Sequence, residues 1–344
     1  MSLPINRRKA FVYASASLAA GSLPFSTHAQ GWPDRPIRIV VPFAAGAGTD
    51  AVGRLMAQKL GDILGQSVVV ENRAGASGAI GSQHVAQSAA DGYTLLLIAA
   101  PFTTVPAALP AAGYDPVGHF APISMIASGP LVWAVNKDLP VNTMQELVAL
   151  ARAKPGYLNY GSAGAGGINH LVLEMLKART QSYITHIPYR GIAPATMDMV
   201  GGQIHAVTGT VPALAPFIKD GRIKALAVTS ERRSSALPDV PSMAESGFAN
   251  FDVLNYFGLV APRGTPAPVL EKLNAAVARA VTLPEVRARF ANDAIEPVAG
   301  SAAQLAQFIA QDYRGWQRVV AQQNLKLDIA CSGGEAENIK KPAV

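Results

Sequence analysis

Cysteine is almost absent from this chain of 344 residues, since Cys331 is the only one. A single cysteine excludes an internal disulfide and any cysteine-based metal cluster. The chain also lacks a run of Lys and Arg interleaved with aromatic residues, so nucleic acid is not indicated as a partner. Beyond the N-terminal segment there is no stretch of about 18 consecutive apolar residues, so no membrane-spanning helix is expected. We therefore expect a soluble protein that is stabilised by burial of an apolar core.

The N-terminal segment has the composition of an export signal. A basic stretch, Arg7–Lys9, precedes an apolar and acid-free run over residues 10–25, and small residues then lead to Ala29. This order of regions is typical of a signal peptide, which we expect to span residues 1–29 with cleavage near Ala29. The mature protein would then be periplasmic. The two adjacent arginines loosely match a twin-arginine leader, so both that route and the ordinary secretory route remain open.

Charge and length set limits on the mature chain. Removal of residues 1–29 takes away three basic and no acidic side chains, so the net charge falls from +6 to +3, with 26 basic against 23 acidic residues. Such a weak field favours neither a membrane surface nor a polyanion. The remaining length and the hydrophobic content of 49% allow a large core, and the length suggests two lobes.

Short β-branched runs alternate with amphipathic helical stretches, which is typical of α/β proteins with parallel strands. Capping boxes at Thr143 with Glu146 and at Ser301 with Gln304 mark the starts of two helices. The expected strands are 37–43, 68–71, 94–99, 131–135, 185–188, 225–229 and 257–260.

One unit, a strand followed by a glycine-rich loop and a helix, occurs twice, over residues 37–64 and 158–176. The two loops are Ala44–Asp50 and Gly161–Asn169. A helix N-terminus offers unpaired N–H groups and a partial positive charge, so a loop of small residues leading into it can cradle an anion. Neither loop contains Lys, Arg or His, which favours a compact carboxylate over a polyphosphate. Tight turns without a ligand are the alternative interpretation.

Three residues near these loops need separate consideration, and two of them have alternative interpretations. Asp50 would repel an anion, so we expect it to cap the helix by accepting backbone N–H groups of the next turn, and contact with a ligand cation or hydroxyl is the alternative. Tyr189 and Arg190 follow another expected strand and could meet the polar end of a ligand. Arg190 could equally be a solvated residue at the rim.

Aromatic side chains could give such a site an apolar wall for a hydrocarbon or aromatic ligand body. Membership of the core is the alternative for each of them. The candidates are Phe43, Phe102, Trp133 and Tyr189.

An exported NAD(P)-dependent oxidoreductase is the main enzymatic alternative. Gly46, Gly48 and Ala51 have the spacing of a dinucleotide-binding fingerprint, and Glu71 follows 20 residues later, at the end of the next expected strand. A single fingerprint of this length is weak, and no residue pair suited to hydride chemistry accompanies it. We therefore expect no enzymatic activity and no cofactor.

Two other catalytic patterns fail. Ser162 lies near a strand-to-helix turn, but Tyr160 occupies the place where a serine hydrolase needs glycine. The histidines are not spaced as metal ligands, so we expect no metal site and a structural role for most of them. They are His84, His119, His170, His186 and His205.

Nine stretches in a fixed order carry a family resemblance: 36–43, 48–50, 70–73, 91–96, 158–164, 188–191, 201–203, 225–230 and 237–241. Through them the chain, from Trp32 to Val320, resembles the Bug-type extracytoplasmic receptors of tripartite tricarboxylate transporters. The resemblance implies a type II periplasmic-binding-protein fold with two α/β lobes, a ligand cleft and a hinge that the chain crosses twice. The first lobe would comprise residues 30–131 and 254–330, and the second 132–253. A flexible tail would follow at 331–344.

The resemblance also implies the function. A monomeric receptor would close on a small organic mono- or dicarboxylate, with aromatic acids included, and deliver it to the membrane permease of a tripartite transporter. A sensor protein in the membrane is the alternative partner. Many relatives carry an acidic residue near the position of Gly209, where it can pair with a ligand ammonium, so its absence here argues against an amino acid.

The implied site joins the two glycine loops, which would hold one carboxylate partly through ordered water, with two further segments that shape the distal end. Its expected ligand-binding residues are Phe43, Ala45, Gly46, Ala47, Gly48, Thr49, Asp50, Ser162, Ala163, Gly164, His170, Tyr189, Arg190, Gly191, Thr208 and Gly209.

Overall fold

A computed structural model describes residues 31–322 and 324, apart from Ala47 and Arg190. The expected signal peptide and the expected tail with Cys331 lie outside these residues. The fold described below is that of the compact unit that begins at Arg35. No helix in the part of the chain that the structure describes is long and apolar enough to cross a membrane.

The strands of this unit are β1 (Ile37–Val41), β2 (Val68–Asn72), β3 (Thr94–Ala99), β4 (Phe120–Asn136), β5 (Asn159–Ser162), β6 (Thr185–Pro188), β7 (Ala206–Thr210), β8 (Ile223–Val228), β9 (Leu254–Pro262) and β10 (Glu296–Pro297). They pair in the order β2-β1-β3-β9-β4-β7-β5-β6, and β8 and β10 also pair with β4. The pairs of β1 with β2 and β3, and of β5 with β6 and β7, are parallel, as the alternating sequence pattern predicts. The strands between these two parallel groups are antiparallel.

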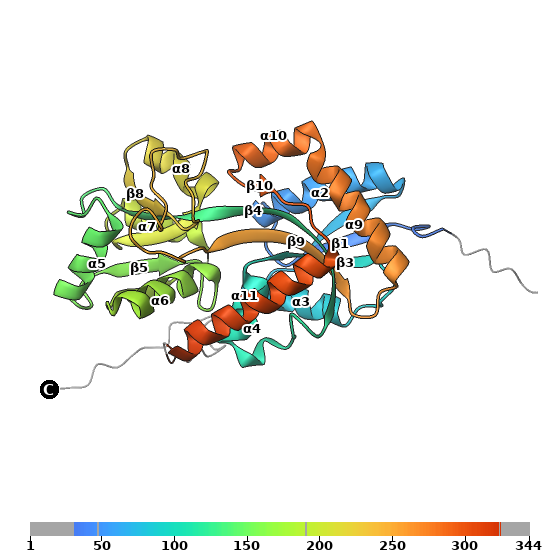
Figure 1. The fold of residues 1–344 in the computed structure, drawn as a ribbon, viewed down its shortest axis with the longest axis horizontal. Helices are drawn as coiled ribbons and strands as arrows, with labels where there is room; N and C mark the ends of the chain where they lie inside the picture. The colour runs from blue at the N-terminus through green and yellow to red at the C-terminus, as the bar shows by residue number, and fades with distance from the viewer. Residues whose placement is uncertain (1–30, 47, 190, 323, 325–344) are drawn as a thin grey trace, which may run out of the picture. The chain divides into compact units, whose positions relative to one another are not determined.

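Strand β4 joins the two groups. Residues 120–130 pair with β9, whereas residues 131–135 pair with β7. Figure 1 shows β4 and β9 side by side as they run from one group of strands to the other. The chain thus passes between the groups along β4 and comes back at β9, which agrees with a hinge crossed twice. The lobe boundaries at residues 131 and 253 stay a prediction.

The helices are α2 (Gly48–Leu64), α3 (Ala79–Ala86), α4 (Pro101–Ala108), α5 (Met144–Ala153), α6 (Ile168–Thr180), α7 (Ile192–Val200), α8 (Val211–Lys219), α9 (Ala267–Thr282), α10 (Pro284–Asn292) and α11 (Ala302–Gln322), with short 3-10 turns at Ala76–Gly78 and Pro110–Ala112. Both capping boxes are present. The Thr143 hydroxyl accepts from the Glu146 amide at 3.1 Å, and Ser301 and Gln304 bond to each other's backbone amides.

Helix α2 places the first glycine loop by packing tightly against the sheet. Val52, Met56 and Leu60 recur every four residues and are buried, as expected for one face of a helix in the core. Burial of each such side chain contributes about 1.5–3 kcal/mol. A Cβ at Gly53 would lie 2.7 Å from a methyl carbon of Val41, so only glycine lets α2 approach β1 this closely. The loop between β1 and α2 is therefore held at both ends.

Three strands differ from the sequence expectation. The expected strand at 131–135 is only the end of β4, and neither β7 nor the two-residue strand β10 was expected. The first part of β4 contains Pro122, Gly129 and Pro130, which have low strand propensity. Antiparallel pairing with β9 along this whole segment overrides that preference.

A cluster of three polar side chains connects α4, α11 and β9. The Thr103 hydroxyl of α4 donates to the Asp312 carboxylate of α11 at 2.6 Å and lies 3.0 Å from the Tyr256 hydroxyl of β9. Burial raises the pKa of Asp312 to about 6, although these hydrogen bonds oppose the shift. Because the pKa is raised above 3.8 in the folded state, ionisation of Asp312 disfavours folding. Stability should therefore fall as the pH rises from about 4 to 6 and stay lower above that window.

Replacement of Asp312 by Asn should remove this pH-dependent destabilisation and keep an acceptor for Thr103. We expect Asp312→Asn to be more stable than wild type by on the order of 1–2 kcal/mol at pH 8 and to lose this advantage at pH 4. Urea unfolding at the two pH values measures the difference, and Asp239→Asn at an exposed site is the control. An equal difference at both pH values would contradict the assignment.

Candidate functional site

The first glycine loop leaves β1 at its carboxyl end and enters α2. Ala44, Ala45, Gly46 and Gly48 are exposed, and Phe43 is half-buried. Gly46 has φ +84°, which favours glycine, and a Cβ at Gly46 or Gly48 would meet nothing within 4 Å. Open space therefore lies over the backbone of this loop, next to the N-terminus of a helix of 17 residues.

Asp50 braces this loop from behind. Its buried carboxylate accepts from the Gly46 amide at 2.9 Å, from Arg54 Nε at 2.9 Å and from Asn72 Nδ2 at 2.8 Å. Burial alone would raise the pKa of Asp50, but the three hydrogen bonds and the charge of Arg54 outweigh it and hold the pKa below its usual value. The sequence interpretation is corrected in one respect, because the backbone donor is Gly46 in the preceding loop and not an amide of the next helical turn.

Asn72, at the end of β2, completes the brace and was missed by the sequence interpretation. Its side-chain amide donates to the Phe43 carbonyl at 3.1 Å as well as to Asp50, and its oxygen accepts from Arg54 at 3.0 Å. Asp50, Arg54 and Asn72 thus form a closed network that holds the loop at Phe43 and at Gly46. The negative charge of Asp50 is matched there, so it does not oppose an anion on the open side.

The second glycine loop leaves β5 and enters α6. Ser162 is fully buried, and its hydroxyl oxygen accepts from the Gly164 amide at 3.1 Å and lies 2.6 Å from His186 Nε2. Gly164 and Gly166 have φ values of +135° and +75°, so the loop needs glycine at both positions. The Ser162 hydroxyl therefore acts inside the loop.

His170 and His186 stack behind this loop, with ring centroids 3.8 Å apart and planes at 12°. The Gly166 amide donates to His170 Nδ1 at 3.2 Å. His170 Nε2 lies 3.5 Å from the buried Glu174 carboxylate, which also accepts from Lys177 at 2.8 Å. His170, expected to bind ligand, thus contacts the loop, and His186 was not singled out from the sequence.

A turn between β2 and α3 is a third element at this place, and it was also missed. Gly75, Ala76, Ser77 and Gly78 all have positive φ, an arrangement that is costly for Ala76 and Ser77 and recurs at functional sites. The Phe43 ring lies against Gly78, where a Cβ would be 3.3 Å from it. The turn therefore packs on the first loop.

The same turn approaches the second loop. A Cβ at Gly164 would lie 3.6 Å from the Ser77 hydroxyl oxygen. The first loop and the second loop are thus brought together on either side of this turn. Two glycine loops from opposite groups of strands thus lie beside the same turn, and their joint binding of a ligand stays a prediction.

Tyr189 follows β6 and flanks the second loop. Its amide donates to the Ser162 carbonyl at 3.0 Å, and its hydroxyl donates to the Asp198 carboxylate at 2.8 Å. Burial, together with the Asp198 hydrogen bond and charge, raises the pKa of Tyr189 to about 12. Gly191 has φ +109° with open space around it. Arg190, like Ala47, lies outside the described residues.

Other expected residues lie in the interior. The Thr208 hydroxyl is buried beside the Tyr160 hydroxyl, and the Asn169 side chain donates to the Thr208 carbonyl at 2.7 Å. Gly209 packs on Leu214, whose atoms would lie 3.0 Å from an added Cβ. Thr208 and Gly209 are therefore buried residues of β7 and have no exposed surface next to the loops.

The aromatic candidates divide between core and site. Phe102 packs on Phe120 and Tyr114, and Trp133 packs on Tyr160, so the core interpretation applies to Phe102 and Trp133. Phe43 and Tyr189 are half-buried beside the glycine loops.

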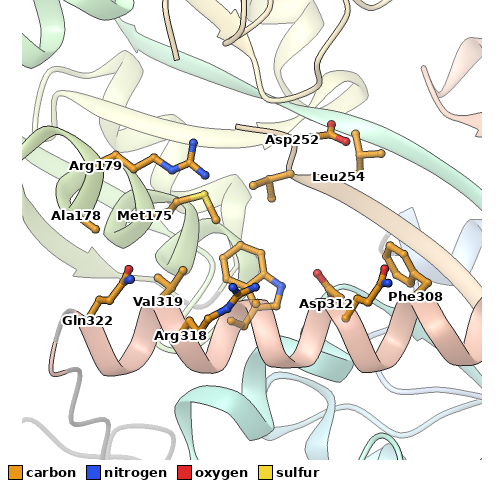
Figure 2. Close-up of a pocket in the computed structure, with 14 residues that line it drawn as sticks. Met175, Ala178, Arg179, Asp252, Leu254, Phe308, Asp312, Arg318, Val319 and Gln322 are labelled. Atoms are coloured by element: carbon orange, nitrogen blue, oxygen red, sulfur yellow. The ribbon is translucent and has the colours of Figure 1, made fainter. Parts of the chain in front are cut away.

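A separate pocket of about 450 Å³ lies between α6 and α11, shown in Figure 2. Arg179 and Met175 enter it from α6, and Asp312, Phe308 and Val319 enter it from α11. Arg179 is already engaged, because its guanidinium donates to the carbonyls of residues 249 and 250. The pocket includes no residue of either glycine loop.

Glu71 was considered for contact with a dinucleotide, and the histidines were considered as metal ligands. Glu71 is paired with Arg38 at 2.9 Å and with Arg73, as a scaffold residue would be. Burial opposes ionisation, but the two arginines lower the pKa of Glu71. Among the residues with described positions, no group of three His, Cys, Asp or Glu side chains could hold a metal ion.

Removal of the Asp50 carboxylate should open the first loop. Asp50→Ala leaves the Gly46 amide, Arg54 and Asn72 without their shared acceptor, so we expect a loss of about 1–3 kcal/mol in the free energy of unfolding. Asp62→Ala, at an exposed position of the same helix, should change it by less than about 0.5 kcal/mol. Urea unfolding measures both. Equal stability of the two variants would show that Asp50 does not brace the loop.

Known proteins are similar to this chain over most of its length. The model of the family described as "Tripartite tricarboxylate transporter family receptor" matches residues 52–325. Protein BugT of Bordetella pertussis is 37% identical over 312 residues, which cover 90% of this chain and 96% of the relative.

Solved structures agree. The periplasmic binding protein BugD is 35% identical with a TM-score of 0.76, over 86% of this chain and 99% of its own. A protein of R. palustris, Rpa4515, solved with adipate, is 34% identical with a TM-score of 0.78, over 86% and 99%. MatC of Rhodopseudomonas palustris, solved with bound malate, is 31% identical with a TM-score of 0.76, over 84% and 100%.

These similarities confirm the expected α/β fold of a periplasmic binding protein. The family to which the similar proteins belong is a family of solute-binding receptors and not of enzymes. The dinucleotide fingerprint at Gly46 is accordingly explained as one of the two glycine loops. The chain belongs to the tripartite tricarboxylate transporter receptor family, as a periplasmic solute-binding receptor of the Bug type.

Proposed function

We propose that this receptor captures a small dicarboxylate without an amino group between its two glycine loops and delivers it to the permease of a tripartite transporter. The observation that carries this proposal is the meeting of two glycine loops, each at the start of a helix and each braced from behind. The proposal follows from the groups that such loops offer to a ligand.

The described residues of both loops offer neutral backbone donors. The first loop has no cationic side chain, and its one acidic side chain, Asp50, is occupied by three donors. The first amides of α2 and of α6 have no carbonyl partner within their own helix, and the helix dipole makes them favourable for a negative group. A carboxylate is small enough to be held by such fixed dipoles.

The ligands of relatives support the choice of a dicarboxylate. Adipate and malate, present in the structures of Rpa4515 and MatC, each carry two carboxylates and no ammonium group. Gly209 in this chain offers no acidic partner for an ammonium group. An amino acid would therefore leave its charged nitrogen without a counter-charge there, which costs free energy in a closed site.

The proximal carboxylate would lie over residues 43–49 and 162–164, and the second carboxylate near Tyr189 and Gly191. Thr208 and Gly209 are buried, so they would shape the distal end from behind and not by direct exposure to it. Ligand contacts of Ala47 and Arg190 remain predictions. The aliphatic or aromatic body of the ligand would contact Phe43.

We further propose that lobe closure presents the ligand to a membrane permease. Residues 30–131 and 254–330 would form one lobe, residues 132–253 the other, and β4 and β9 the connections between them. The family description names a transporter, which favours a permease over a membrane sensor as the partner. The receptor would act as a monomer.

Melting temperatures with a panel of ligands test the proposal. The panel contains adipate, malate, aspartate, glutamate, benzoate and NAD in both redox states. A ligand at 100 times its Kd stabilises by about 2.7 kcal/mol, which should raise Tm by several degrees. We expect the increase with adipate or malate and little with the amino acids. An increase confined to amino acids or to NAD would defeat the proposal.

Two glycine variants separate binding from stability. Gly46 and Gly221 both have positive φ, +84° and +65°, and both have open space where a Cβ would be placed. Replacement of either by Ala should therefore cost a similar amount of stability, about 1 kcal/mol. We expect Gly46→Ala alone to weaken dicarboxylate binding, by roughly tenfold, because its methyl group enters the space over the loop. Calorimetric titration of both variants measures this, and equal Kd values would contradict the site.

A further inference from the structure

The two stacked histidines behind the second loop do more than fill space. Each ring contacts one polar group of that loop, His186 through the Ser162 hydroxyl and His170 through the Gly166 amide. Ser162 in turn accepts from the Gly164 amide. The rings lie 3.8 Å apart and nearly parallel, so they form one packed unit. Through this unit both left-handed glycines of the loop are connected to the strand β6 and the helix α6.

The hydrogen bonds fix the state of each ring. His170 Nδ1 accepts from Gly166, so the proton of the neutral ring is on Nε2, which faces Glu174 at 3.5 Å. Glu174 is held as a carboxylate, because the hydrogen bonds from His170 and Lys177 lower its pKa despite burial. Burial, followed by the proximity of His170, lowers the pKa of His186 to about 3. His186 is therefore neutral at physiological pH.

The Ser162 hydroxyl has one proton and two acceptor positions. It accepts from Gly164 and contacts His186 Nε2 at 2.6 Å, and the Gly164 carbonyl lies 3.1 Å away. If Nε2 of His186 carries the proton, Ser162 accepts twice and donates to the Gly164 carbonyl, so every group is satisfied. The hydroxyl then has no free proton for a ligand. This loop would bind its ligand through its other backbone amides, because the Gly164 and Gly166 amides already donate to Ser162 and His170 and so fix the shape of the loop.

We infer that His186 and His170 are positioning residues that hold the second glycine loop in its ligand-binding form without touching the ligand. The inference rests on the proposed function for its effect on binding. It extends that function, since it assigns the loop's geometry to a stacked pair of imidazoles. It also assigns the Ser162 hydroxyl to the loop itself.

The test uses His186→Leu, which keeps apolar volume and removes the bond to Ser162. We expect the Gly164 and Gly166 amides to exchange hydrogen about tenfold faster, and Kd for adipate or malate to rise about five- to tenfold. His186→Gln, whose amide can still reach Ser162, should restore most of both. Amide exchange followed by NMR and calorimetric titration are the two measurements.

His205→Leu is the matched control. His205 is also half-buried, and its Nδ1 accepts from the Asn159 amide at 3.0 Å, at the opposite end of β5 from Ser162. Its removal should leave exchange at Gly164 and Gly166, and Kd, within twofold of wild type. If His186→Leu does not fold, Ser162→Ala removes the same hydrogen bond with a smaller change. It should then give the faster exchange and the weaker binding.

Amide exchange and calorimetric titration together distinguish failure of this inference from failure of the proposed function. If wild type binds no carboxylate, the proposed function fails, and the exchange rates alone still decide whether the histidines hold the loop. If wild type binds and His186→Leu or Ser162→Ala matches it in both exchange and Kd, the inference is wrong while the function stands. Equal effects of His186→Leu and His205→Leu would also overturn it, because the histidines would then act through general stability.

Discussion

The hydrogen bond from the Gly46 amide to the Asp50 carboxylate decides what the first loop can bind. An acidic side chain at the start of a helix would repel an anion if its charge were free. Arg54 and Asn72 complete the set of donors around Asp50, so the carboxylate holds the loop and its charge is matched. Only neutral backbone groups then face the open side of the loop. The N-terminus of α2 can therefore bind a carboxylate without repulsion from Asp50.

The second loop is also held in shape by side-chain hydrogen bonds, but from different residues. It has no acidic side chain of its own, and its left-handed glycines are held by Ser162 and His170, with His186 stacked behind. Each brace includes a side chain from a neighbouring strand, Asn72 of β2 for the first loop and His186 of β6 for the second. Two uncharged loops at the ends of parallel strands suit a single carboxylate that is held between them.

The two loops, the parallel pairing and the capping boxes could be predicted because each has a local signal: glycines after a strand, β-branched runs, or Ser and Thr three residues before Glu or Gln. The braces could not, because Asn72 lies 22 residues from Asp50 and His186 lies 24 from Ser162. Two partners are local, because Arg54 lies four residues after Asp50 and His170 lies four residues after Gly166. Strand β7 was missed for a similar reason, since its pairing with β4 and β5 is entirely long-range.

Amide hydrogen exchange over the whole chain, with and without adipate or malate, tests the central claim most directly. If the two loops grip a carboxylate together, exchange should slow at residues 43–49, 75–78 and 162–167 at once, with a further effect at 189–191, and change little elsewhere. Protection confined to the pocket between α6 and α11, or to a single loop, would contradict the account, as would no change with either acid.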